Sequence, residues 1–133
     1  GEGMAATAAA EMPTADEIAT CAWLPDDELN VYSDTYERNG FQGGLNWYRG
    51  RFVEAFIREQ QIFSGTTIDV PACFISGSSD WGVYQTPGAL EKMQQSACSD
   101  SHGCHLIDGA GHWVQQEQPG AVVRLLLAFL AQS

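Results

Sequence analysis

Hydrophobic residues in the first half of the chain recur with helical spacing. Leu29, Tyr32 and Tyr36 are separated by three and four residues, and Asn39-Gly40 then supplies a stop, which predicts an amphipathic helix. The acids at 26–28 offer a capping side chain and suit the positive end of this helix. After a glycine-rich turn, a second apolar helical face is formed by Phe52, Val53, Phe56, Ile57 and Phe63. The first half is therefore predicted to be a helical module.

The pattern changes to short, mostly apolar runs in the second half. Residues 72–76 and 104–107 have strand length, and each run is followed by a polar, glycine-rich segment. Between them, Thr86-Pro87 is predicted to start a helix that ends near Ala97. Pro119 opens a last helix whose apolar residues cover most of its circumference, which predicts a largely buried helix. The order strand, helix, strand, helix is typical of an α/β fold with a parallel sheet.

Two strands of this length do not complete a stable sheet. Parallel strands are covered on both faces and occur within larger sheets, so we expect the chain to be the end of a larger α/β fold. Its 133 residues allow one domain or a piece of one. Residues 1–20 are rich in Ala and Thr and contain no aromatic residue. We expect them to be a flexible tail or linker with at most a turn at 14–19.

The chain carries a strong negative charge. Seventeen acids against six bases give a formal net charge of −11, and Lys92 is the single lysine. Nucleic acids and anionic membranes require a basic patch, so both are excluded as partners. The longest apolar run, residues 125–131, is well short of the roughly 20 residues that a membrane span requires.

The four cysteines form neither a C-x-x-C pair nor a dense framework. We therefore expect reduced thiols and a cytoplasmic protein. A disulfide between Cys98 and Cys104 is kept as an alternative. His102 and His105 lie close to these cysteines, but the spacings match no standard zinc pair, and His105 falls inside a predicted strand. No metal is predicted.

Asp80 and His112 are the candidate catalytic residues. Asp80 follows the first predicted strand by four residues and His112 follows the second by five, so both are expected at the carboxyl edge of the sheet. A carboxylate beside an imidazole fixes its tautomer and stabilises its protonated form, as in the orienting half of a catalytic triad. Position alone leaves open the alternative of two polar loop residues with no joint role.

The segments around both residues resemble those of a known superfamily. Residues 75–80, ISGSSD, and 107–119, IDGAGHWVQQEQP, are similar to the acid and histidine segments of α/β hydrolases. In that superfamily the order is nucleophile, acid, histidine, and the histidine loop runs into a final helix. Esterases, dehalogenases and peroxidases share such loops, so this resemblance reaches no further than the superfamily.

An upstream segment narrows the resemblance to one family. Residues 40–49, GFQGGLNWYR, resemble the cap-domain segment G-F-x-G-x-L-N-W-Y-R of soluble epoxide hydrolases, which carries one of two tyrosines that hydrogen-bond the epoxide oxygen. Trp23-Leu24-Pro25 and the acidic helix after it resemble the stretch that leads into this segment. The resemblance spans residues 22–131, with its motifs in the family's order.

The resemblance implies a fold class and a set of site residues. It implies the C-terminal portion of an α/β-hydrolase fold, with two parallel strands and flanking helices at 65–133, preceded by a helical cap segment at 21–64. Tyr48 is implied to hold the epoxide oxygen, and a phenol, with a pKa of about 10, can protonate the alkoxide that forms when the ring opens. Trp47 and Trp113 are expected to wall the substrate pocket.

The chain also departs from the family. An aspartate nucleophile on a strand-to-helix elbow, an H-G-x-P oxyanion segment and an earlier cap tyrosine have no counterpart before Tyr48. We therefore expect the chain to supply the acid, the histidine and one tyrosine, to be inactive alone, and to require an N-terminal half or to self-associate. The resemblance implies a small-molecule epoxide as substrate, a vicinal diol formed through a hydroxyalkyl ester as product, and no cofactor.

Two alternatives stay open. A haloalkane or haloacid dehalogenase uses the same ester chemistry with a halide leaving group. Because a halide needs no proton, Tyr48 argues against it. A non-catalytic fragment would carry Asp80 and His112 unused and would act by binding a partner or itself.

Overall fold

Two parallel strands lie in the second half of the chain. In the computed structural model, which describes residues 3–132, β1 (Ala72–Gly77) pairs in parallel with β2 (Ser101–Ile107). Phe74 lies opposite Cys104 and Gly77 opposite Ile107. The predicted parallel pair is confirmed, and both strands extend one to three residues beyond their predicted bounds.

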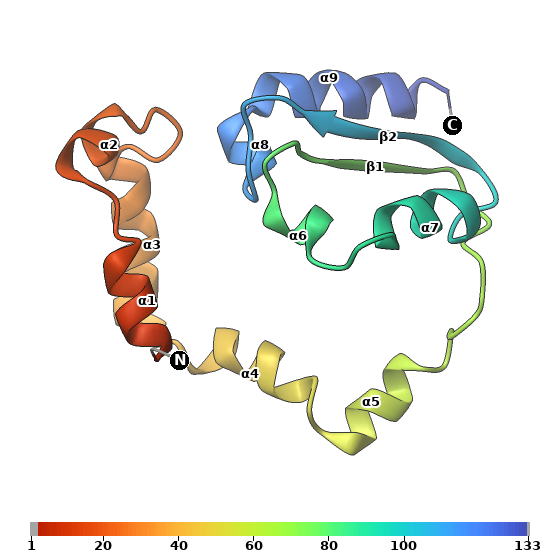
Figure 1. Cartoon of the computed structure of the whole chain (residues 1–133), viewed down its shortest axis with the longest axis horizontal. Coiled ribbons are helices and arrows are strands. Elements are labelled where there is room, and N and C mark those ends of the chain that lie inside the picture. The colour runs from red at the N-terminus through yellow and green to blue at the C-terminus, as the bar shows by residue number, and fades with distance from the viewer. Residues whose placement is uncertain (1–2, 133) are drawn as a thin grey trace.

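Helices flank the strand pair on two sides. α6 (Trp81–Tyr84) and α7 (Ala89–Ser96) connect β1 to β2, and α8 (Val114–Glu117) and α9 (Pro119–Leu130) follow β2. Figure 1 shows α9 on one side of the strands and α6 and α7 on the other. Parallel strands require such a crossover, because a tight hairpin cannot join them.

The helix predicted to start at Thr86-Pro87 begins later. Gly88 is the N-cap of α7 with a φ of 80°, a left-handed conformation that glycine adopts without strain. Before it, the short helix α6 forms directly after Asp80, whose side chain caps it. The cap by Asp80 therefore starts a helical turn at Trp81, closer to β1 than the start that Thr86-Pro87 indicates.

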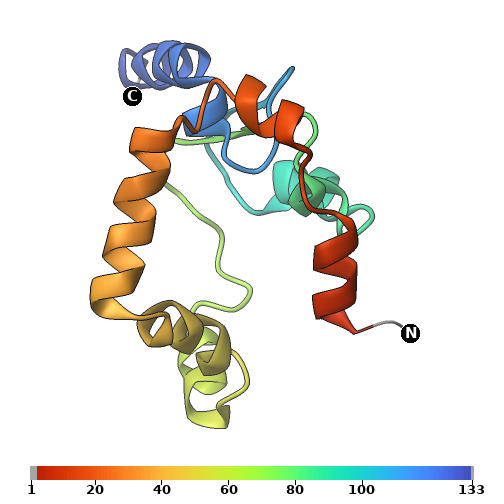
Figure 2. The same cartoon turned by 90° about the vertical axis from the view of Figure 1, so that its left-hand side faces the viewer.

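The first half of the chain is helical, as predicted. α3 (Asp26–Asn39) has its acids in the first turn, but Pro25 is the N-cap and no side chain caps the helix. α4 (Gln42–Gly50) and α5 (Glu54–Gln60) are separate helices, so the second apolar face is divided at 51–53. Figure 2 shows α3 running between α4 and the end of the core that carries α8.

Two short helices form in the segment expected to contain at most one turn. α1 (Met4–Ala10) is alanine-rich, and alanine has the highest helix propensity. α2 (Ala15–Thr20) begins with a capping box, in which Thr14 Oγ1 accepts from Glu17 N–H at 3.3 Å and Glu17 Oε2 accepts from Thr14 N–H at 2.7 Å. Gly1 and Glu2 lie outside the described residues.

Buried positions gather at the carboxyl ends of the two strands. They are Ser76, Gly77, Asp80, Ala110 and Val114. Four of them belong to a strand end or to the loop that follows it, and Val114 is the first residue of α8 after the second loop. The best-enclosed part of the described chain is therefore the edge at which the sequence analysis placed the candidate catalytic residues.

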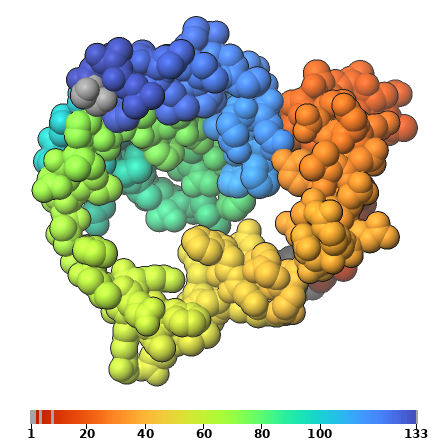
Figure 3. Space-filling model, turned by 180° about the vertical axis from the view of Figure 1, so that it is seen from behind, coloured from red at the N-terminus to blue at the C-terminus, as the bar shows by residue number. Residues whose placement is uncertain are grey.

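The prediction that the last helix is largely buried is wrong. Leu126 and Leu127 of α9 expose 43% and 62% of their surface, and no residue of the helix is buried. Leu29 and Tyr32 of α3 are also exposed, at 44% each. Much of each apolar face is therefore left uncovered by the rest of residues 3–132. Figure 3 shows an opening through the molecule between the core and the helices α4 and α5.

All four cysteines are free, and residues 3–132 contain no group of three or more His, Cys, Asp or Glu side chains that could hold a metal ion. The cytoplasmic location stays a prediction from the sequence. Among the described helices, none combines the length and the apolar character needed to cross a bilayer.

Candidate active site

Asp80 is held by its local backbone and by a strand residue. It follows β1 after a two-residue turn, in which the N–H of Asp80 donates to the carbonyl of Gly77 at 3.2 Å. Its Oδ1 accepts from the N–H of Gly82 at 2.8 Å, and its Oδ2 accepts from the hydroxyl of Ser76 at 2.9 Å. With 9% of its surface exposed, Asp80 is a buried carboxylate with a fixed orientation.

His112 lies against this carboxylate. Its Nδ1 is 3.0 Å from Asp80 Oδ1, although the two residues are 32 positions apart. The imidazole stacks on the ring of Trp81, with centroids 5.5 Å apart and planes at 23°, and the ring of Trp113 meets it edge-on at 5.1 Å. With Nδ1 engaged by Asp80, Nε2 is the ring nitrogen left to exchange a proton.

The environment of Asp80 stabilises its ionised form. The hydrogen bond with His112 is the main cause that lowers the pKa of Asp80, and the bonds from Gly82 and Ser76 act in the same direction. Burial opposes them, because removing a carboxylate from water favours its protonated form. The net effect is a lowered pKa, so Asp80 is charged at neutral pH and can orient an imidazole.

Ser76 and Trp81 were not singled out by the sequence analysis. Ser76 is a small residue inside an apolar strand run, and nothing in its spacing indicates that its hydroxyl bonds a carboxylate four residues later. Trp81 follows the candidate acid directly, which is the signal that could have drawn attention to it. Both contacts depend on the turn after β1, which brings Ser76 against Asp80 and Trp81 against His112.

Tyr48 lies in a different part of the molecule from the Asp80–His112 pair. It is on α4, its surface is 62% exposed, and its hydroxyl makes no hydrogen bond to any residue in the described range. Figure 1 shows α4 separated from α6 and the strand ends by the opening. The described chain therefore brings the acid and the histidine together but leaves the tyrosine apart from them.

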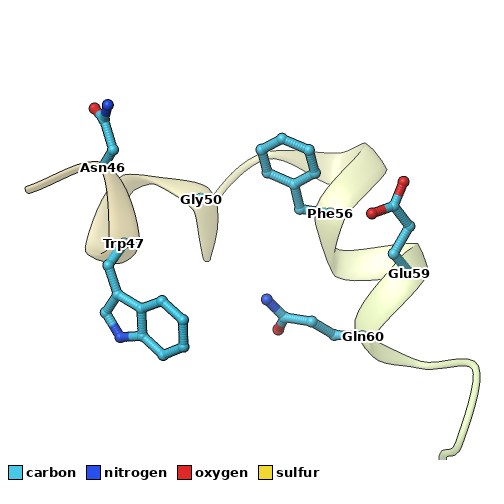
Figure 4. A pocket seen from close by; sticks show the side chains of 6 residues that line it. All are labelled: Asn46, Trp47, Gly50, Phe56, Glu59 and Gln60. Carbon is cyan, nitrogen blue, oxygen red and sulfur yellow. The ribbon is translucent and has the colours of Figure 1, made fainter. Parts of the chain in front are cut away.

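Trp47 and Trp113 line two separate hollows. Trp47 is 78% exposed and faces a hollow of about 460 Å³ between α4 and α5, together with Phe56 and Gln60 (Figure 4). Trp113 lines a smaller, mostly apolar hollow of about 200 Å³ with Trp23, Leu24, Leu29, Tyr32 and Gln116. The second hollow lies beside His112, because Trp113 contacts both.

A hydrogen bond across the second hollow joins the two halves of the chain. The side-chain amide of Gln116 donates to the hydroxyl of Tyr32 at 2.8 Å. Tyr32 lies on α3 and Gln116 on α8, so this bond links the helical module to the helix that follows the His112 loop. Tyr32, on the apolar face predicted for this helix, thus has a polar partner across the hollow.

Relatives of known activity were found by sequence. Epoxide hydrolase A of Mycobacterium tuberculosis is 42% identical over 114 residues, which cover 82% of this chain and 32% of the relative. Epoxide hydrolase 2 of Siraitia grosvenorii is 31% identical over 116 residues, which cover 82% of this chain and 35% of the relative. No family model matches the sequence.

Solved structures show the same relationship in three dimensions. A mutant of potato epoxide hydrolase superposes with a TM-score of 0.79 at 28% identity, covering 100% of this chain and 40% of that one. The chain belongs to the epoxide hydrolase family. An epoxide hydrolase from an endophytic Streptomyces superposes with a TM-score of 0.75 at 35% identity, covering 83% of this chain and 32% of that one. The α/β-hydrolase fold class is thereby confirmed.

The epoxide hydrolase relatives are much longer than the matched region. This chain spans about a third of the length of the curated relatives it matches. The segments that match include both the helical module and the strand pair, since most of this chain is covered.

Proposed function

We propose that this chain supplies the acid, the histidine and one lid tyrosine of an epoxide hydrolase that converts epoxides to vicinal diols. The observation that carries the proposal is the 3.0 Å contact between His112 Nδ1 and Asp80 Oδ1 at the carboxyl ends of two parallel strands. Open α/β folds place functional side chains at this edge. In this proposal Asp80 orients His112, and Tyr48 acts on the epoxide oxygen.

The first half-reaction forms an ester. A carboxylate nucleophile, supplied from outside this chain, attacks one epoxide carbon, and the bond between that carbon and the epoxide oxygen breaks. The oxygen takes the phenolic proton of Tyr48, because an alkoxide is a poor leaving group. The products are a hydroxyalkyl ester and a tyrosinate.

The second half-reaction hydrolyses the ester. Nε2 of His112 takes a proton from water, and the resulting hydroxide attacks the ester carbonyl carbon. The bond between that carbon and the alkyl oxygen breaks, and this oxygen takes the hydroxyl proton of the carboxylic acid that forms. This transfer releases the diol and restores the carboxylate. The proton on His112 then returns to the tyrosinate. Asp80 stabilises the imidazolium while it exists.

The exposed apolar faces support a larger enzyme. The apolar side chains of Phe52, Phe63 and Leu127 expose 86%, 76% and 62% of their surface. Together with the opening in Figure 3, they provide surfaces that a preceding N-terminal part, carrying the nucleophile, would cover. Homology to epoxide hydrolases favours epoxide opening over halide displacement.

A chimaera tests the proposal. The segment of Mycobacterium tuberculosis epoxide hydrolase A that matches this chain is replaced by this chain, and diol formation is followed by mass spectrometry. We expect turnover by the chimaera and none by this chain alone. A folded chimaera that forms neither diol nor a covalent adduct would favour the non-catalytic alternative.

Histidine variants of the chimaera separate the two half-reactions. His112→Gln is expected to lower diol formation by about 10²–10⁴-fold, the typical contribution of a general base, and to accumulate the ester on the nucleophile. His102→Gln is the matched control, because His102 lies 3.1 Å from Asp100 in a second histidine–aspartate pair away from the site. The control is expected to keep full turnover.

A further inference from the structure

Glu117 binds the backbone on both sides of His112. Its Oε2 accepts a hydrogen bond from the N–H of Gly111 at 2.7 Å, and its Oε1 accepts one from the N–H of Trp113 at 2.9 Å. One carboxylate therefore holds both residues that flank the histidine. We call these two hydrogen bonds the Glu117 clamp. Hydrogen bonds to an ionised acceptor are shorter and stronger than neutral ones.

The short helix α8 directs the carboxylate back toward the loop. Glu117 is its last residue, and its own N–H donates to the carbonyl of Trp113 at 2.9 Å, which closes one helical turn. Val114 in the same turn is buried and anchors it. An added Cβ at Gly111 would lie 3.4 Å from Glu117 Oε1, so the carboxylate lies directly against this glycine.

Side-chain packing alone does not enclose His112. Its side chain is 48% exposed, and the two indoles that contact it, Trp81 and Trp113, are 61% and 51% exposed. Within residues 3–132, the N–H groups of Gly111 and Trp113 have no acceptor other than Glu117, and Glu117 has no cationic partner. In the described chain, this carboxylate is therefore what holds the two backbone N–H groups that flank His112.

We propose that Glu117 is a positioning residue that holds the backbone of His112 so that Nδ1 faces Asp80. The inference rests on the proposed function, in which Asp80 selects the imidazole tautomer with its proton on Nδ1 and leaves Nε2 free to accept a proton from water. Glu117 does not touch the reacting atoms. It acts by keeping the peptide groups on either side of the imidazole from rotating away from Asp80.

The experiment measures the tautomer of His112 by NMR. The 133-residue chain is labelled with ¹⁵N in its histidine rings and in its backbone, and spectra are recorded at about pH 8.5, where free imidazole is neutral. His102 and His105 serve as internal references in the same spectrum. The variants are Glu117→Gln, which keeps the side-chain shape but replaces one acceptor oxygen with an NH₂ group, and Glu117→Ala. The matched control is Glu91→Gln, a glutamate on α7 away from the loop.

The wild-type chain is expected to hold His112 with its proton on Nδ1. In both Glu117 variants we expect a large loss of this form in favour of the Nε2–H form. We also expect amide exchange at Gly111 and Trp113 to rise roughly tenfold to hundredfold, the usual effect of losing a hydrogen bond to a charged group. Amide exchange in β1 and β2 is expected to stay unchanged, and Glu91→Gln is expected to match the wild type throughout.

Several results would overturn the assignment. A wild-type tautomer in both variants, with faster exchange at Gly111 and Trp113, would show that the clamp exists but does not position the ring. Unchanged exchange would show that the clamp does not form, and loss of protection throughout β1 and β2 would make Glu117 a structural residue. If His112 of the wild-type chain carries its proton on Nε2, the result contradicts the Asp80–His112 pairing of the proposed function itself, and not only the role of Glu117.

Discussion

Gly77 at the end of β1 lies directly against the backbone of Ala110 in the histidine loop. An added Cβ at Gly77 would overlap the carbonyl oxygens of Ala110 and Gly111. The same approach allows the N–H of Ser79 to donate to the carbonyl of Ala110 at 3.0 Å. Close backbone contact between the two strand-end loops therefore sets the distance between the acid and the histidine.

Gly77→Ala is predicted to destabilise the chain strongly. The new methyl group would meet main-chain oxygens rather than a flexible side chain, so relief requires the loops to separate, and a cost of about 2–3 kcal/mol is expected. Gly43→Ala is the control, because nothing lies within 4 Å of its added Cβ and alanine favours a helix by about 0.5–1 kcal/mol over glycine. Urea unfolding of both variants measures the difference, and equal stabilities would contradict the contact.

Asp80 is predicted to make the stability of the chain depend on pH in the acid range. Its pKa is lowered in the folded state, mainly by the bond with His112, so the unfolded chain binds the proton more readily. The stabilisation is present above the unfolded pKa of about 3.9 and is lost as the pH falls through the lower folded value. Urea midpoints between about pH 6 and pH 2 are expected to fall less steeply for Asp80→Asn. If the urea midpoints of both proteins fall equally with pH, the pKa of Asp80 does not differ between the folded and unfolded states.

The strand pair and its edge could be predicted because their signals are local. A continuous apolar run followed by glycine and aspartate defines each strand end, and parallel pairing follows from the intervening helix. The proximity of Asp80 and His112 is a consequence of that topology. The contacts of Ser76 and Glu117 depend on the exact turns after each strand, which residue spacing does not specify.

Burial was the least predictable property. The pattern on α9 indicates a helix that is apolar on most sides, and such helices are buried in complete folds. Leu127 is nevertheless 62% exposed, since the described residues do not cover this part of the helix. The helix at 15–20 was missed for a different reason: the capping box of Thr14 and Glu17 is a short signal within an otherwise tail-like composition.

The isolated chain is predicted to bind the hydrophobic dye ANS and to self-associate. Monomeric proteins rarely expose apolar patches larger than a few hundred Å², and both Leu126 and Leu127 are exposed on α9. Leu127→Gln is expected to lower dye fluorescence, whereas Arg124→Gln on the same helix is expected to leave it unchanged or raise it. Light scattering after size exclusion gives the mass, and a dye-negative species of 14.4 kDa would show that these faces need no cover.

Tyr48→Phe in the chimaera is predicted to slow ester formation while leaving ester hydrolysis to His112. Removing the phenolic proton leaves the epoxide oxygen with fewer donors, and proton transfer by one positioned side chain contributes about 10²–10⁴-fold. A second tyrosine can share this role, so a loss of roughly tenfold or more in single-turnover ester formation is expected. Tyr36→Phe is the matched control, because Tyr36 stacks on Phe41 with centroids 4.4 Å apart and serves packing. If both variants form the ester at the wild-type rate, Tyr48 does not act on the epoxide oxygen. The argument from Tyr48 against a dehalogenase, which displaces a halide through the same kind of ester, would then no longer hold.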